Sequence, residues 1–151
     1  MNEEKDTTPY ILSIEDNPDD FEIISRSLRK VAPGRVIRQC QSGDEALKFL
    51  RSQQEPDATE ENIGLPRIIL LDLNLPGMDG RDILKMIKND INLKSIPVIV
   101  FSTSSNEKDI ETCYNNGANA YLKKPSTLEG FVDIAQAVDR FWFECAFLAI
   151  A

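Results

Sequence analysis

The chain contains 151 residues and carries a formal net charge of −8, with an estimated isoelectric point of 4.6. Its 42% hydrophobic and 28% charged residues are typical of a soluble globular protein of one domain. So acidic a surface repels nucleic-acid phosphates, and the sequence has neither a run of about 18 apolar residues nor a signal-peptide pattern. We therefore expect a cytoplasmic protein that binds neither DNA nor a membrane.

Short apolar runs alternate with segments of helical periodicity along the chain. The runs predict strands, in chain order, at 10–14, 36–40, 68–71, 98–101 and 120–122. The periodic segments predict helices at about 18–31, 43–50, 80–89, 106–116 and from about 127 past Trp142. Strands that are apolar on both faces and joined by helices form parallel sheets with right-handed crossovers. The expected fold is therefore α/β, a five-stranded parallel sheet with helices on both faces.

Capping residues support several of these helix ends. Asn17 followed by Pro18 predicts the start of the first helix, because Asn caps helices and Pro is favoured at their first position. Ser42, with Glu45 three residues later, forms a capping-box pattern at the second helix. Gly117 is suited to the left-handed conformation that ends many helices.

The predicted elements leave two segments without periodicity. Residues 1–9 are polar and predict a loose tail, and 54–66 predict an acidic surface loop inside one domain over 10–151. A solvated loop is the simpler interpretation of the acidic stretch, although a partner contact there stays open.

Charged or hydroxyl groups follow four of the predicted strands. Glu15 and Asp16 follow the first strand, Asp72 the third, Ser102 the fourth and Lys124 the fifth. In an open parallel sheet the ligand site lies outside the carboxyl ends of the strands. Polar strand ends are common singly, but this combination at one edge indicates a functional site.

The carboxylates among these residues predict a bound cation. Two carboxylates about 5 Å apart repel each other by roughly 3 kcal/mol at an effective dielectric of about 20. The chain has no histidine and only three widely spaced cysteines, which argues against zinc, a disulfide framework and His-activated nucleophiles. Oxygen ligands alone favour a hard ion, so we expect Mg²⁺, with Mn²⁺ as an alternative.

These residues, in this order and at strand ends, resemble the receiver domain of bacterial two-component response regulators. The resemblance covers roughly 9–141 and implies the (βα)₅ flavodoxin-like receiver fold. It also implies a protein that is not a conventional enzyme, although it phosphorylates itself from small donors and loses the group slowly. Its motifs are Glu15-Asp16, the segment from Asp72 to Gly80, Ser102 and Lys124-Pro125.

The resemblance implies a role for each of these residues. Asp72 is expected to accept a phosphoryl group from a sensor histidine kinase, with Ser102 and Lys124 contacting that group. The metal ligands are expected to be Glu15 (through water), Asp16, Asp72 and the backbone carbonyl of Asn74. Further positions implied by the family are Ser102 with Tyr121 as the conformational switch, and the Asn74 side chain with Ser104 as the pair that tunes dephosphorylation.

The expected output is a change in protein contacts, because no DNA-binding segment follows the receiver pattern. In this family phosphorylation alters the face formed by the fourth helix, fifth strand and fifth helix, on which Tyr121 lies. A half-buried strand aromatic with a surface hydroxyl is the simpler interpretation of Tyr121.

The C-terminal segment contains more apolar side chains than one buried helix face requires. They predict a homodimer or partner interface, with a helix that folds back on its own domain as the alternative. The C-terminal Phe-Trp and the acidic loop also resemble stand-alone receivers of cyanobacterial phytochrome-like histidine kinases. The candidate interface residues are Phe141, Trp142, Phe143, Phe147 and Leu148.

Other functions remain open at this point. The chain could be a phosphorelay intermediate, or a degenerate receiver used as a binding module, which the complete set of site residues disfavours. An aspartate-nucleophile phosphatase is less well supported, because Asn74 occupies the position of its general acid and an amide cannot serve in that role. Gly-rich nucleotide-binding motifs are absent from the sequence.

Overall fold

The computed structural model describes residues 8–55 and 62–149. The strands are β1 (Tyr10–Ile14), β2 (Val36–Cys40), β3 (Ile68–Leu71), β4 (Val98–Ser102) and β5 (Ala120–Lys123). The helices are α1 (Pro18–Val31), α2 (Gly43–Ser52), α3 (Gly80–Asn89), α4 (Glu107–Asn115), α5 (Leu128–Asp139) and the π-helix η1 (Arg140–Cys145).

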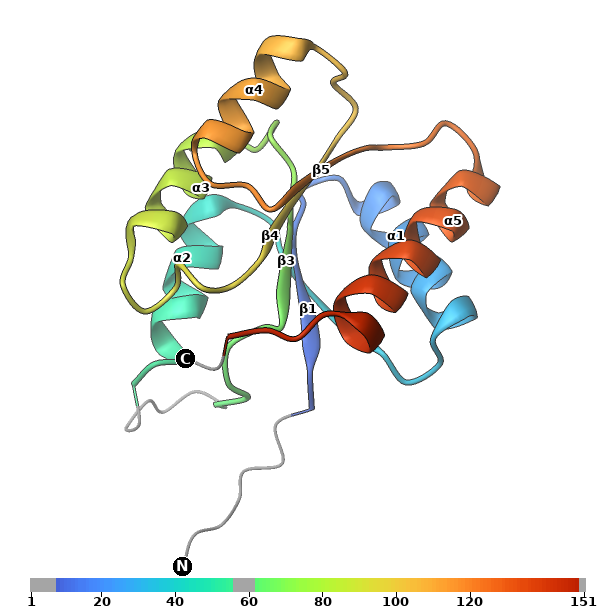
Figure 1. The fold of residues 1–151 in the computed structure, drawn as a ribbon, viewed down its shortest axis with the longest axis horizontal. Coiled ribbons are helices and arrows are strands. Elements are labelled where there is room, and N and C mark those ends of the chain that lie inside the picture. Colours follow the sequence, from blue (N-terminus) through green and yellow to red (C-terminus); the bar gives the residue numbers. More distant parts are fainter. Residues whose placement is uncertain (1–7, 56–61, 150–151) are drawn as a thin grey trace, which may run out of the picture.

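The strands form one parallel sheet in the order β2-β1-β3-β4-β5. Helices α2, α3 and α4 lie on one face of the sheet, and α1 and α5 lie on the other (Figure 1). This arrangement confirms the predicted five-stranded α/β fold. It also brings the carboxyl ends of all described strands to one edge, at the top of Figure 1.

The predicted caps are found at the ends of these helices. Asn17 accepts hydrogen bonds from the backbone N–H groups of Asp19 and Asp20, with Pro18 at the first turn of α1. Ser42 caps α2 in the same way, while the Glu45 carboxylate accepts from the N–H of Gln41 rather than from the cap residue itself. Gly117 after α4 has a φ of +98°, the left-handed conformation expected there.

Two hydrophobic clusters hold the helices against the two faces of the sheet. Alternate residues of β1 contribute to different clusters, because successive side chains of a strand point to opposite faces. Leu12 packs with α2 and α3, whereas Ile11 packs with α1 and α5. Helices therefore cover both faces of the sheet, and polar side chains gather where the strands begin and end.

The last helix changes its winding at Arg140. Val138 near the end of α5 is buried, whereas Phe141 and Cys145 in η1 are exposed. The apolar side chains at helical spacing in this segment therefore do not all face the domain. A π-helix has more residues per turn than an α-helix, so η1 changes which side chains face the domain: Trp142 and Phe143 pack against the hydrophobic cluster between α1, α5 and the sheet, and Phe141 does not.

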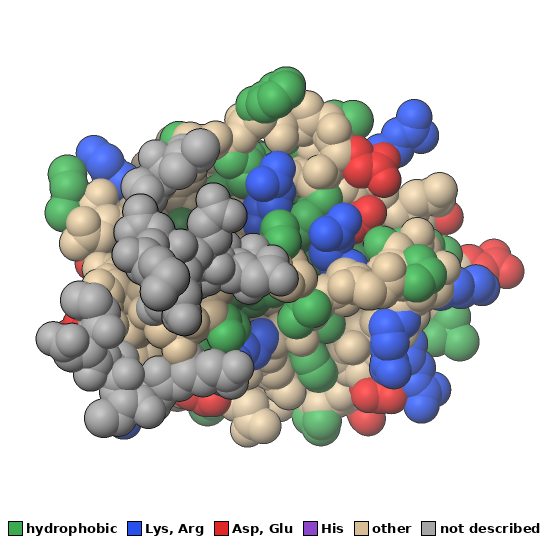
Figure 2. All heavy atoms as spheres, turned by 90° about the horizontal axis from the view of Figure 1, so that it is seen from below, with side chains coloured by type: hydrophobic (Ala, Val, Ile, Leu, Met, Phe, Trp, Pro, Cys, Tyr) green, Lys and Arg blue, Asp and Glu red, His purple; other side chains and the backbone are tan. Residues whose placement is uncertain are grey.

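The segment after η1 runs across the edge of the sheet where the strands begin (Figure 1). Arg67 fixes it there, donating to the backbone oxygens of Trp142 (2.9 Å) and Ala146 (3.3 Å). Figure 2 shows this edge from below, where hydrophobic side chains and Lys or Arg side chains are interspersed.

Parts of the predicted tail and acidic loop lie outside the described residues, namely 1–7 and 56–61. The described end of the loop is anchored, because Gln53 accepts from the N–H groups of Ile63 and Gly64, and Tyr10 donates to the Gly64 carbonyl. Among the helices of the described residues, none combines the length and apolar character needed to span a bilayer.

Candidate functional site

Residues predicted from the strand ends meet at the carboxyl edge of the sheet. Glu15 and Asp16 follow β1, Asp72 follows β3, Ser102 is the last residue of β4, and Lys124 follows β5. Glu15, Asp72, Ser102 and Lys124 are buried, while Asp16 is exposed. The neighbouring positions of β1 and β3 in the sheet explain why the acidic residues come together.

The Lys124 ammonium lies among three carboxylates. Its Nζ is 2.7 Å from Glu15 Oε2, 2.8 Å from Asp20 Oδ2 and 3.1 Å from Asp72 Oδ2. We refer to Glu15, Asp20, Asp72 and Lys124 as the acid–lysine cluster. An ammonium group has three hydrogen-bond donors, so the three carboxylates can satisfy it completely.

Backbone contacts hold the cluster in place. The N–H of Asp72 donates to the Ile14 carbonyl, and its carboxylate Oδ1 accepts from the N–H of Asn74 at 3.2 Å. The N–H of Lys124 donates to the Ser102 carbonyl at 2.7 Å. Both side chains therefore start from backbone that is tied to a neighbouring strand, which limits their motion.

Gly80 supports the same geometry from the start of α3. A Cβ added at this position would lie 2.6 Å from the Leu73 Cα and would also collide with the Asp72 carbonyl oxygen. The close approach of α3 to the strand end thus requires glycine.

Burial and the neighbouring charges both shift the pKa values of Glu15 and Lys124 in the acid–lysine cluster. Burial raises the pKa of Glu15 to about 7, with a further increase from the Asp72 charge, while Lys124 acts in the opposite direction. Burial lowers the pKa of Lys124, but its hydrogen bonds to Asp20 and Glu15 outweigh this effect and leave the pKa above its ordinary value. Lys124 is therefore a permanent cation among acids that outnumber it.

Part of this site fits a divalent cation. Oxygen atoms of Glu15, Asp16 and Asp72 lie within 4.8 Å of one another. A donor set made of carboxylate oxygens suits Mg²⁺ or Mn²⁺. Only one residue of this trio, Asp16, is exposed, which gives an ion a route in from solvent.

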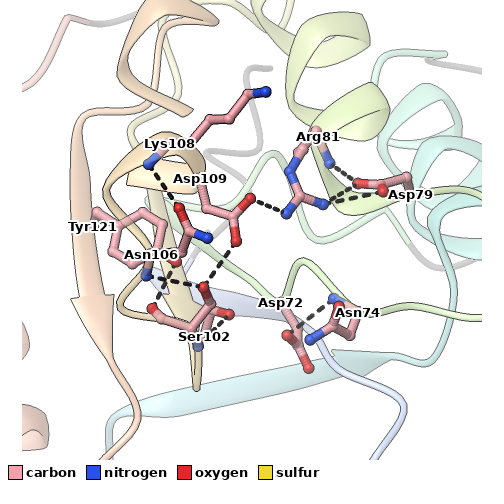
Figure 3. A network of polar contacts seen from close by, with 10 residues as sticks. Asp72, Asn74, Asp79, Arg81, Ser102, Asn106, Lys108, Asp109 and Tyr121 are labelled. Atoms are coloured by element: carbon pink, nitrogen blue, oxygen red, sulfur yellow. Dashed lines mark hydrogen bonds and ion pairs between the residues drawn. The ribbon is translucent and has the colours of Figure 1, made fainter. Parts of the chain in front are cut away.

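A second group of polar residues joins α3 to α4 beside the cluster (Figure 3). Arg81 forms ion pairs with Asp79 and with Asp109, and Asp109 Oδ2 accepts from the Ser104 hydroxyl at 2.8 Å. We refer to Asp79, Arg81, Ser104 and Asp109 as the α3–α4 network. Pairing with Arg81 is the main reason why the pKa of Asp109 lies below its ordinary value.

The predicted switch residues contact this network. The Tyr121 hydroxyl donates to the Ser104 carbonyl at 2.8 Å, and Ser102 Oγ accepts from the Ser104 N–H at 3.2 Å (Figure 3). Ser102 and Tyr121 thus meet at one loop residue, Ser104. Asn74 lies beside Asp72 on the other side of this view.

The candidate interface residues are divided between two environments. Phe141 and Phe147 have exposed fractions of 54% and 103%. Trp142 and Phe143 are half-buried against the hydrophobic cluster on the α1–α5 face of the sheet. The Arg35 guanidinium lies 3.9 Å from the centre of the Phe143 ring. The half-buried Leu148 lines a hollow at the lower edge of the sheet. Part of the C-terminal segment therefore folds back on its own domain.

Sequence reasoning missed the residues that reach the site from helices. In the sequence, Asp20 is one of two acids in the first turn of α1, and Arg81 and Asp109 are charged residues that no motif singles out. A helical position whose partner is set by another helix or strand leaves no local pattern. For Asp20 the only available signal was its place four residues after Asp16.

Comparison with known proteins assigns the class to which this protein belongs. The family model described as the response regulator receiver domain matches residues 11–136. That match covers most of the chain, so this protein belongs to the response regulator receiver family. The family is one of signalling proteins rather than of conventional enzymes.

Particular relatives include photoreceptor-associated regulators. The response regulator Rcp1 of Synechocystis sp. is 36% identical over 151 residues, with 100% of both chains covered. The structure of the phosphorylated cyanobacterial phytochrome response regulator RcpA is 38% identical, with a TM-score of 0.83 over 94% of this chain and 99% of that one. The Mn²⁺-bound form of Rcp1 is 36% identical, with a TM-score of 0.81 over 95% of this chain and 100% of that one.

Proposed function

We propose that this receiver is a phosphorylation-controlled signalling protein in which Asp72 accepts a phosphoryl group from a sensor histidine kinase. One observation carries the proposal. The nearly buried Asp72 carboxylate is held at a strand end by the Asn74 N–H on one oxygen, with Lys124 3.1 Å from the other. This arrangement places a nucleophile beside a fixed positive charge.

The transfer is an in-line displacement. A carboxylate oxygen of Asp72 attacks the phosphorus of a phosphohistidine, forming a P–O bond as the P–N bond breaks. The electron pair of that bond stays on the leaving imidazole, which is neutralised by a proton. Mg²⁺, or Mn²⁺, held by Glu15, Asp16, Asp72 and the Asn74 carbonyl, would supply charge neutralisation for the transferred group.

The chain's own side chains complete the site. Lys124 is placed to pair with a phosphoryl oxygen, and the Ser102 hydroxyl donates to another once Asp72 is modified. Because these groups belong to the receiver itself, we expect self-phosphorylation from small phosphodonors and slow loss of the group to water. Asn74 and Ser104 are the residues proposed to tune that loss.

The proposed signal is a change at the α4–β5–α5 face. Movement of Ser102 toward the phosphoryl group would pull on Ser104, whose carbonyl also accepts from Tyr121. Tyr121 is therefore placed to report the change to a partner. We expect Tyr121→Ala to alter partner affinity without altering phosphorylation of Asp72, which separate binding and labelling measurements would check.

Similarity to known response regulators suggests the kinase partner, and exposed aromatic side chains suggest how the protein assembles. RcpA, one of the similar proteins, is a cyanobacterial phytochrome response regulator, so we propose a phytochrome-like histidine kinase as the phosphodonor, in the cytoplasm. Residues 10–151 are proposed to act as one receiver domain. The exposed Phe141 and Phe147 support a homodimer contact, which sedimentation of a chain lacking 142–151 would test.

The central experiment is labelling from a small phosphodonor with Mg²⁺. A receiver takes up about one phosphoryl group per chain, bound at Asp72, and loses it slowly. Asp72→Asn should take up none, because an amide cannot form the acyl phosphate. Turnover of many equivalents would favour the phosphatase, and no uptake by the parent protein would favour a binding module.

A further inference from the structure

Asp20 is the member of the acid–lysine cluster that comes from a helix rather than from a strand end. It occupies the first turn of α1, where its N–H donates to Asn17 at 3.2 Å. Its Oδ2 is 2.8 Å from Lys124 Nζ, closer than the Asp72 oxygen at 3.1 Å. The side chain of Lys124 is 4% exposed and that of Asp20 is 27% exposed, so Asp20 lies at the rim of the cluster.

The three acceptors of Lys124 differ in one respect. Glu15 and Asp72 belong to the trio of carboxylates that can hold a cation, together with Asp16, whereas Asp20 does not. A cation that binds this trio competes with Lys124 for the oxygens of Glu15 and Asp72. Asp20 is the acceptor that would remain available to the ammonium during this exchange.

We propose that Asp20 is a positioning residue that holds Lys124 at the site while a divalent cation takes over Glu15 and Asp72. This inference rests on the proposed function and deepens it. With Asp20 present, the cation enters without having to expel a buried lysine or strip it of all its acceptors. Lys124 then stays beside Asp72, where an incoming phosphoryl group needs its charge.

Without the Asp20 carboxylate, the remaining charged acceptors of Lys124 in the cluster are themselves metal ligands. The lysine would then compete directly with the cation. An amide oxygen in place of the carboxylate is a weaker acceptor for an ammonium group, because it keeps the hydrogen bond but carries no negative charge opposite the cation. Metal binding should therefore weaken in Asp20→Asn although no ligand has been removed.

Asp19 provides the matched control. It precedes Asp20 in the same first turn of α1, its N–H bonds to the same Asn17 oxygen, and its side chain is exposed. Asp19→Asn therefore removes the same charge from the same helix end, with the same effect on the helix dipole. Asp20 differs from Asp19 in its contact with Lys124 and in the lower exposure of its side chain that accompanies this contact.

Calorimetric titration with Mg²⁺ alone, on the full chain, tests the proposal. We expect Asp20→Asn to raise the Kd about tenfold and Asp19→Asn to raise it about twofold, with Asp20→Glu close to the parent. Because a general charge effect would act without the lysine, Asp20→Asn is repeated in the Lys124→Gln chain. There we expect only about a twofold change.

The possible outcomes distinguish a failure of the Asp20 role from a failure of the proposed function. Equal effects of Asp19→Asn and Asp20→Asn, or an undiminished tenfold effect in the Lys124→Gln chain, would overturn the role of Asp20. A parent chain that binds no Mg²⁺ would overturn both this inference and the proposed function. Mg²⁺ binding with the expected Asp20 effect, but no phosphoryl uptake at Asp72, would overturn the proposed function alone.

Discussion

The acid–lysine cluster and the α3–α4 network lie at the same edge of the sheet, but burial makes them physically different. The side chain of Lys124 is 4% exposed and that of Arg81 is 27% exposed. In the cluster, burial is the largest influence and raises the pKa of Glu15 to about 7. In the network, pairing with Arg81 is the largest influence and lowers the pKa of Asp109.

Because of this difference in burial, the charges of the cluster and those of the network suit different roles. A buried excess of acids around one cation is costly, and a second cation can relieve it. The partly exposed α3–α4 network has access to water, so its ion pairs contribute modestly and can exchange easily. The cluster is therefore suited to binding and chemistry, and the network to contacts that exchange readily.

The largest expected effect comes from removing the buried cation. Lys124→Met leaves three close carboxylates without their ammonium partner, and we expect the metal-free protein to lose about 3 kcal/mol of unfolding free energy. Saturating Mg²⁺ should recover much of this loss, because it neutralises the same acids. Urea unfolding in EDTA and in Mg²⁺ measures both; a loss that Mg²⁺ leaves unchanged contradicts this account of the cluster.

A somewhat smaller effect is expected where α3 meets the strand end. Gly80→Ala forces a methyl group against the Leu73 Cα and the Asp72 carbonyl, and overpacking of this kind costs about 2 kcal/mol. We also expect weaker Mg²⁺ binding, since Asp72 must shift. Chemical unfolding and calorimetry report the two effects. Gly34→Ala is the comparison for backbone strain without a clash, because Gly34 has a φ of +90° but a Cβ added there would meet no atom within 4 Å.

Disrupting the partly exposed α3–α4 network should have little effect on stability. Arg81→Ala removes ion pairs to Asp79 and Asp109, and we expect a decrease in Tm of about 2 °C or less, smaller still at high salt. Thermal melts at low and high salt test this. A salt-independent loss as large as that of Lys124→Met would show that the two groups of charges do not differ as described.

The smallest expected effect is a pH dependence at Asp109. Its folded-state pKa lies below the ordinary value of 3.8, so its stabilising contribution is present above that value. The contribution is lost as pH falls through the lowered folded-state pKa. The Tm difference between the parent and Asp109→Asn should therefore be constant near neutral pH and disappear in acid. Glu111→Gln, at an exposed position on the same helix, controls for loss of a carboxylate.

Much of the fold was predictable from local patterns. Apolar runs identified the strands, and Asn17 with Pro18 marked the start of α1 because capping depends on neighbouring residues alone. The positions of Glu15, Asp72 and Lys124 after strands also followed from sequence, since parallel strands end at one edge. The change to π-helical winding at Arg140, which exposes Phe141, had no such signal.

The sequence by itself therefore determined which residues form strands, which helices they alternate with, and which acids and lysine reach the carboxyl edge. Only the tertiary structure decided that Asp20 meets Lys124 and that Ser104 links Tyr121 to Asp109. The physical reason is the range of the forces involved. Burial periodicity and capping act within a few residues, whereas the partner of a charged side chain depends on strand order and on how the helices pack across the sheet.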